Sequence, residues 1–336
     1  MSTASVPLPN WINYALLPLI NLTLAFLVSG LVVWIIGENP WEALKLMLEG
    51  ALGSGEGIGF TLFYATNFIF TGLSVAVAYH AGLFNIGSEG QAYLGGLGAA
   101  LAALALDHYM PWYVTMPFAI MAAALFGAAW AFIPAWLQAK RGSHIVITTI
   151  MFNYIASAVL IFLLVDVLRP DGQMDPATAN FPEATALPTL NQLPLFNLFF
   201  TSKVPANITL LIALAAAVGV WALLWRTRLG YSIRAFGKSE DAARYAGINP
   251  FRITMIAMLL SGALAGMMAI NNVMGEAGRL LQNSASGAGF IGIAVALMGR
   301  NHPLGVVLAS ILFGFLFQGG AELGMWTKIP IEMRVV

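Results

Sequence analysis

The chain contains no cysteine, which excludes disulfides, thiolate catalysis and cysteine-based zinc or iron–sulfur sites. Charge is also scarce: 9% of the 336 residues are charged, against about 25% in a typical soluble domain. The formal net charge is zero, so electrostatics give no reason to expect a nucleic-acid partner. Hydrophobic residues make up 59% of the chain and the mean hydropathy is +0.81. Water cannot solvate such a surface, so we expect most of it to face a lipid bilayer.

Long apolar runs recur along the whole sequence, which predicts an all-α fold, a polytopic transmembrane helical bundle. We expect roughly nine or ten spans with interrupted helices. They would form a single transmembrane domain over residues 1–336. The last residues, from Lys328 to Val336, resemble the approach to one more span, and the sequence leaves open whether Val336 is the native end or a truncation. The runs lie at 14–36, 58–79, 92–106, 112–139, 144–165, 208–225, 252–274, 286–299 and 303–320.

The distribution of Lys and Arg predicts the orientation of these spans, because cytoplasmic loops are enriched in basic residues. The segment 226–252 is therefore expected to be a cytoplasmic loop, and 166–207, acidic on balance and carrying six prolines, an extracytoplasmic one. Alternation of the spans then places the N-terminus in the cytoplasm. Six of the fifteen basic residues lie in the cytoplasmic loop: Arg226, Arg228, Arg234, Lys238, Arg244 and Arg252.

A polar stretch, Gly82-Leu-Phe-Asn-Ile-Gly-Ser-Glu-Gly-Gln91, interrupts the apolar sequence between two runs. Irregular backbone at membrane depth persists only if it is buried in protein or lines a wet cavity, and an ionisable residue there indicates function. The alternative is a cytoplasmic turn in which Glu89 meets water. On the first interpretation the candidate solute-path residues of this stretch are Asn85, Ser88, Glu89 and Gln91.

The cytoplasmic loop contains the signals of a short capped helix. Ser239 can cap its start, with Glu240 favourable in the first turn, and Gly247 can end it in the left-handed conformation. Asn249 and Pro250 then begin the next helix. The small residues Ala242, Ala243 and Ala246 predict a low-relief surface that could fit a groove in a partner. The alternative is an ordinary basic loop.

Other motifs are weaker. Gly237-Lys238-Ser239 is not a phosphate-binding loop, because Ser232 stands where such a loop needs glycine. Any ATP-driven work therefore requires a separate subunit. Gly262 and Gly266 form a small-residue face, which we expect to pack within the chain. The alternative is packing against a helix of a second membrane subunit. The four histidines show no metal-site spacing, so neither a metal nor another cofactor is expected.

Polar residues also gather at the outer end of the run at 252–274. Asn272 and Glu276 are candidates for contact with solute entering from outside. The alternative is an exposed loop in which Glu276 pairs with Arg279 at i,i+3.

Three segments together resemble the permeases of bacterial ABC importers, in the family that serves branched-chain amino acids, simple sugars and nucleosides. They are Phe-Asn-Ile-Gly-Ser-Glu-Gly-Gln at 84–91, Gly-Lys-Ser-Glu-Asp-Ala-Ala-Arg-Tyr-Ala-Gly-Ile at 237–248 and Leu-Ser-Gly-Ala-Leu-Ala-Gly at 260–266. The residues of these segments are most similar to those of the nucleoside and simple-sugar branch. The resemblance implies that 226–252 is the coupling loop that docks on the ATPase, through Gly237, Ser239, Glu240, Ala243, Arg244 and Gly247.

The resemblance also implies partners: ABC ATPase subunits, a second permease subunit that is often a different chain, and an extracytoplasmic solute-binding protein. The expected function is a permease subunit, not an enzyme, of an ATP-driven importer in the bacterial inner membrane. The resemblance implies that the solute is a nucleoside or simple sugar. The near absence of intramembrane charge agrees with a small neutral solute. Alternatives are a branched-chain amino acid permease and a stand-alone secondary transporter, in which Glu89 would have to serve as the ion relay.

Overall fold

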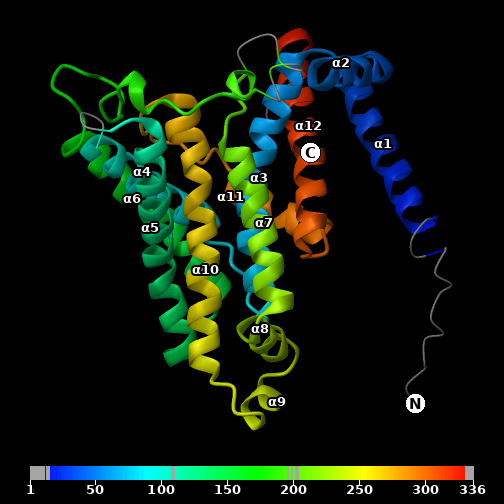
Figure 1. Ribbon diagram of the computed structural model, residues 1–336. Helices are drawn as coiled ribbons and strands as arrows, with labels where there is room; N and C mark the ends of the chain where they lie inside the picture. Colours follow the sequence, from blue (N-terminus) through cyan, green and yellow to red (C-terminus); the bar gives the residue numbers. More distant parts are fainter. Residues whose placement is uncertain are drawn as a thin grey trace.

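The structure, a computed structural model, describes residues 12, 16–106, 110–194, 197, 200 and 204–329 (Figure 1). This part of the chain is helical and has two isolated β-bridges. The first six helices are α1 (Leu17–Ile36), α2 (Pro40–Leu52), α3 (Gly55–His80), α4 (Ser88–Leu106), α5 (Trp112–Arg141) and α6 (Ile145–Asp166). After the short 3₁₀ helices η2 (Glu183–Thr185) and η3 (Leu190–Gln192) come α7 (Thr209–Arg226), α8 (Arg228–Lys238), α9 (Glu240–Tyr245), α10 (Pro250–Ile270), the π-helix η4 (Asn271–Ala277), α11 (Ala288–Met298) and α12 (Pro303–Trp326).

The polytopic helical bundle is confirmed, although fewer helices are long enough to span than the sequence suggests. Within the described residues, six have the length and composition of a membrane span, and the pair α1–α2, bent by 109°, would make a seventh. One expected span, the run at 286–299, forms the 11-residue α11. Eleven residues rise only about 16 Å, about half the hydrocarbon thickness of a bilayer. A count of apolar runs includes this half-helix as a full membrane span and therefore gives too many spans.

The expected start of the first span and most of the expected approach to a further span fall on residues outside the described part of the chain. Residues 1–11 and Tyr14, where the first apolar run was expected to begin, lie outside the described residues. Residues 330–336, which contain most of the expected approach to a further span, also lie outside them.

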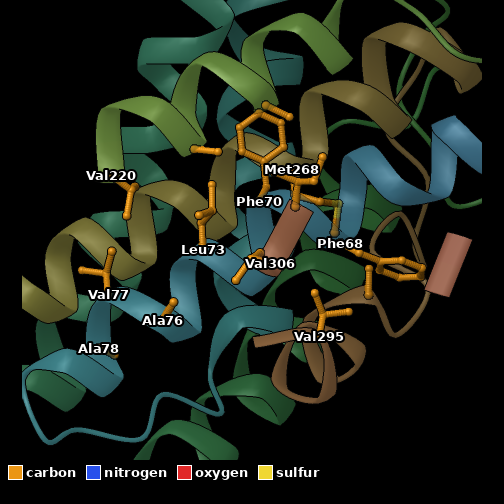
Figure 2. Packing of buried hydrophobic residues seen from close by; sticks show 14 of the residues in the cluster. Phe68, Phe70, Leu73, Ala76, Val77, Ala78, Val220, Met268, Val295 and Val306 are labelled. Atoms are coloured by element: carbon orange, nitrogen blue, oxygen red, sulfur yellow. The ribbon is translucent and has the colours of Figure 1, made fainter. Parts of the chain in front are cut away.

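The bundle has inner and outer helices. In their most apolar windows α3 is 83% buried and α10 with η4 is 67% buried, whereas α5 and α6 are each 28% buried. The large core cluster is centred on α3. Phe68, Phe70 and Leu73 of that helix lie together with Met268 of α10 and Val306 of α12 (Figure 2). The outer helices therefore present their apolar side chains outward, as a lipid-facing surface requires.

Glycines bring α10 into backbone contact with α4 and α5. A methyl group on Gly266 would overlap the carbonyl oxygen of Ala123 in α5, and one on Gly95 of α4 would overlap the backbone of Gly266. Gly262 approaches Gly127 of α5 in the same way. The expected use of Gly262 and Gly266 for packing within the chain is confirmed.

The connecting segments divide between the two ends of the bundle. The helix α2 and the segment that follows α6 lie at one end, and α8 and α9 lie at the other (Figure 1). This agrees with the expectation that the segments 166–207 and 226–252 lie on opposite sides of the membrane. Which end faces the cytosol stays a prediction.

Candidate coupling surface and solute path

The segment 226–252 folds into two short helices, α8 and α9, and the predicted caps of α9 are confirmed. The Ser239 hydroxyl accepts a hydrogen bond from the backbone N–H of Ala242 (3.3 Å), so it caps the helix start. Gly247 follows the helix end with φ +80°. Asn249 then caps α10 by accepting a hydrogen bond from the Arg252 N–H (3.2 Å). Residues 228–238 were expected to be loop, but they form α8, which Thr227 caps.

The low-relief surface expected on α9 lacks one of its three alanines. Tyr245 is 98% exposed, and Ala242 and Ala246 are also exposed. Arg244 forms an exposed i,i+4 ion pair with Glu240 (3.1 Å). Ala243, however, is only 2% exposed and packs in the main core cluster. It anchors α9 to the bundle and cannot belong to an outward low-relief surface.

A cavity of about 330 Å³ lies between α9 and the body of the protein. Four of the predicted coupling residues, Gly237, Ser239, Glu240 and Arg244, contribute to its wall. The opposite wall comes from the turn after α3, the end of α5 and the start of α10, through Ala81, Gly82, Leu83, Gln138, Ala139, Pro250, Phe251 and Thr254. The short helix therefore contacts the bundle through Ala243 and has a cavity beside it.

The C-terminal end of α8 touches the turn that precedes the polar stretch at 82–91. A Cβ on Gly237 would overlap the carbonyl oxygen of His80, so only glycine fits. Gly82 lies against Gly237 and has φ +71°. The two glycines place the coupling segment in backbone contact with the chain leading to α4. Sequence reasoning missed this contact because the two positions are about 155 residues apart.

Three side chains of the polar stretch form a buried hydrogen-bonded network. Asn85 donates through Nδ2 to Gln91 Oε1 (2.9 Å) and to the hydroxyl of Ser261 in α10 (2.8 Å). Ser88 and Ser261 each share a hydrogen bond with the hydroxyl of Ser74 in α3 (3.1 and 3.0 Å). Asn85, Ser88 and Gln91 are at most 1% exposed. The network ties α3, α4 and α10 together.

Glu89 holds the start of α11. Its two carboxylate oxygens accept hydrogen bonds from the backbone N–H groups of Gly287 (2.9 Å) and Gly289 (2.8 Å). The side chain is 3% exposed, so the interpretation as a turn that meets water is wrong. A carboxylate is favourable there because N–H groups at a helix start have no partner within the helix. The assignment of Asn85, Ser88, Glu89 and Gln91 to the solute path stays a prediction, which their close packing does not support.

A second cavity, of about 150 Å³, contains the other two predicted path residues, Asn272 and Glu276, in its wall. It lies where α10 passes into the π-helix η4 and where the half-helix α11 begins. Both features are typical of functional sites in membrane proteins. Asn67 of α3 also lines it, a residue that the sequence analysis did not single out because it is one amide in a long apolar run. The remaining lining residues are Phe63, Tyr64, Phe68, Ala285, Ser286, Ala288 and Phe317.

Asparagine amides connect this cavity to Asn207, at the end of the segment 166–207. Asn67 donates to Asn272 (2.8 Å) and accepts from Asn271 (2.9 Å), which in turn accepts from Asn207 (2.9 Å). Asn272 also donates to the carbonyl oxygen of Ser284. The chain of amides fixes η4 against α3 and against the segment before α7.

The alternative ion pair at this end of the bundle is wrong. Arg279 pairs with Asp175 of the segment 166–207 at 3.9 Å, rather than with Glu276. Backbone hydrogen bonds from Thr178 to Leu280 and from Phe181 to Gly278 join the same two segments. Among the described residues, no group of three His, Cys, Asp or Glu side chains is arranged to hold a metal ion.

The apolar helices around a buried polar centre define a multi-pass membrane protein, and its interrupted helices are typical of transporters. The chain belongs to the family described as the permease component of the branched-chain amino acid transport system, whose model matches residues 57–336. The resemblance drawn from the three sequence segments is thereby confirmed.

Three relatives are similar over nearly the whole chain. The guanosine ABC transporter permease protein of Bacillus subtilis is 34% identical over 96% of this chain and 90% of its own length. The nucleoside ABC transporter permease protein NupB of Lactococcus lactis is 36% identical over 90% of this chain and 83% of its own. The glucose ABC transporter permease protein TsgB13 of Haloferax volcanii is 32% identical, over 97% and 85% respectively.

Proposed function

We propose that this chain is the permease subunit of an ATP-driven importer for nucleosides, and that a separate ATPase docks on α8 and α9. The observation that carries the proposal is the coupling segment itself: an exposed, capped six-residue helix anchored by the buried Ala243 and joined to the bundle through Gly237. Relatives named as guanosine and nucleoside permeases support the choice of solute. A relative named as a glucose permease keeps simple sugars as the second candidate.

The mechanism follows from how α9 is attached. ATP binding would close the ATPase subunits and push α8 and α9 toward the bundle. Because Gly237 meets the turn at 80–82 without intervening side chains, that push would reach the chain leading into α4. Glu89 at the start of α4 holds the beginning of α11, so α4 and α11 would move together. The chain itself performs no bond chemistry in this mechanism.

The proposal includes the partners and the setting. The protein would lie in the inner membrane of a bacterial cell, with its N-terminus and α9 in the cytoplasm. The translocation path would run between this chain and a second permease, which we expect to be a different polypeptide. An extracytoplasmic binding protein would deliver solute to the end that carries the segment 166–207.

The experiment is uptake into vesicles reconstituted with the ATPase, both permeases and the binding protein. Guanosine, a pentose, glucose and leucine are offered in turn, with and without ATP. We expect ATP-dependent accumulation of guanosine. Accumulation of leucine alone would make the chain a branched-chain amino acid permease. Uphill transport without nucleotide would make it a secondary transporter, and either result would overturn the proposal.

A further inference from the structure

We propose that the cavity of about 150 Å³ between α3, η4, α11 and α12 is the site at which this permease recognises the planar base of a nucleoside, an inference that rests on the proposed function. The site uses the faces of aromatic rings for one part of the recognition and asparagine amides for the other. The lining residues come from three regions of the chain, and α3 supplies both aromatic rings and the amide of Asn67.

Aromatic rings form one wall of this base-recognition cavity. Four of its ten lining residues are aromatic: Phe63, Tyr64 and Phe68 of α3 and Phe317 of α12. The Phe317 ring packs on Phe68 (centroids 5.0 Å apart) and on Tyr64 (5.6 Å), which fixes its orientation. Stacking on such a wall is a general way to bind a nucleobase, because every base has a π-face.

Amide groups form another part of the wall. Asn67 and Asn272 are nearly buried, at 4% and 8% exposed, and both reach the cavity. Among the described residues, Asn67 uses one of its two amide N–H donors, in the bond to Asn272. The N–H groups of Asn272 bind Ser284 and Met268, so the donor that this wall offers to the edge of a base is the second N–H of Asn67. The Asn67 oxygen beside it accepts from Asn271 and has a second lone pair as an acceptor. Proteins that hold an isolated base combine such edge contacts with stacking.

The size and position of the cavity favour a ring over a whole solute. Its volume is below the roughly 300–1,000 Å³ of common small-molecule sites, so it would take the base and leave the ribose to the space beside it. It lies at the break between α10 and η4 and at the start of α11, and transporters place substrate at interrupted helices. Ala288 begins α11 and lines the cavity, so movement of the helix held by Glu89 would change the site.

The first test measures transport kinetics in the reconstituted importer, after ATP-dependent guanosine uptake by the wild type has been established. Phe317→Leu is expected to raise KM for guanosine roughly fivefold or more, the factor that loss of one stacked ring produces. The matched control is Phe313→Leu, one turn earlier on α12, which packs on Phe68 but does not line the cavity. Equal KM values for the two variants would overturn the inference and leave the proposed function intact.

The second test does not depend on the folding of a core variant. Because the chain has no cysteine, Ser286→Cys introduces a single thiol at the cavity with little change in volume. Guanosine is expected to slow the reaction of this thiol with a maleimide several-fold, and an equal concentration of glucose is not. Met174→Cys, at a 93% exposed position in the segment 166–207, is the control whose labelling neither solute changes. Protection by glucose but not by guanosine, or by neither, would contradict a base site.

Discussion

Glu89 shows how a single buried carboxylate can be structural in a transporter. An isolated charge at membrane depth is costly, and sequence alone leaves a relay and a solvated turn as the two interpretations. The structure supplies a third role, because both oxygens bind backbone N–H groups around the start of α11. Charge-assisted hydrogen bonds of this kind are stronger than neutral ones. The carboxylate therefore joins two interrupted helices.

Replacing Glu89 tests this role. In Glu89→Gln one carboxylate oxygen becomes an NH₂ group that faces an N–H donor, so one backbone N–H loses its partner. We expect the free energy of unfolding in detergent to fall by about 1–3 kcal/mol. Glu49→Gln, at an exposed position, is the matched control and should change it by less than about 0.5 kcal/mol. Unchanged stability of Glu89→Gln, together with loss of an ion-driven uptake, would favour the secondary transporter.

Asn67 marks the limit of prediction at the residue scale. Asn85, Ser88, Glu89 and Gln91 draw attention because they cluster in sequence, and the structure buries them among helices. Asn67 is the one amide side chain in its apolar run, and its partners Asn271 and Asn272 lie about 205 residues away. Such a set is defined by the packing of α3 against η4, which no local pattern encodes.

At the scale of elements, the end of α9 depends on a backbone conformation. Gly247 has φ +80° and open space around it, so a side chain there meets strain and no clash. A β-branched residue in the left-handed region costs about 1–2 kcal/mol. We therefore expect Gly247→Val to lower ATP-driven uptake roughly 5- to 30-fold at equal expression.

Gly142 provides the control for this prediction. It ends α5 at φ +65°, also with open space around it, and it lies outside α9. Gly142→Val introduces the same strain and should leave uptake close to that of the wild type. Full uptake by Gly247→Val, or an equal loss in both variants, would remove α9 from the coupling mechanism.

The contact of α10 with α4 and α5 is limited by backbone atoms. Because a side chain on Gly266 would meet the carbonyl oxygen of Ala123, Gly266→Val must separate the helices. We expect a loss of about 1–3 kcal/mol or more in the free energy of unfolding. Gly219→Val places the same side chain on α7 in open space and should have little effect. Thermal unfolding of the two variants in the same detergent makes the comparison, and equal melting temperatures would refute the packing role.

Local signals predict the elements that depend on local chemistry. The caps of α9 at Ser239 and Gly247 and the start of α10 at Pro250 follow from neighbouring residues. The helix α8 was missed because its basic residues resemble those of a loop, whereas its buried Ile233 and Phe236 pack against the bundle. The half-length of α11 was missed because hydropathy does not reveal that a helix begins inside the protein.

In the whole molecule, the coupling helix and the proposed solute site lie in different parts of the helical bundle. The coupling helix α9 lies at one end of the bundle, and the base-recognition cavity lies at the break between α10 and η4. Glu89 connects the two, because it holds the start of α11, which lines the cavity. The sequence predicts the helical class, the order of the apolar runs and the family. It does not predict which runs are half-helices, because that depends on contacts such as those of Gly287 and Gly289 with Glu89.

The proposed coupling requires that α9 faces the cytosol and is covered there by the ATPase. Tyr245→Cys places a single thiol at a 98% exposed position of a chain that has no other cysteine. An impermeant maleimide should label it in inside-out vesicles stripped of the ATPase, fail to label it in intact cells, and react much more slowly once the ATPase is restored. Labelling from outside intact cells, or a rate that the ATPase leaves unchanged, would contradict the account.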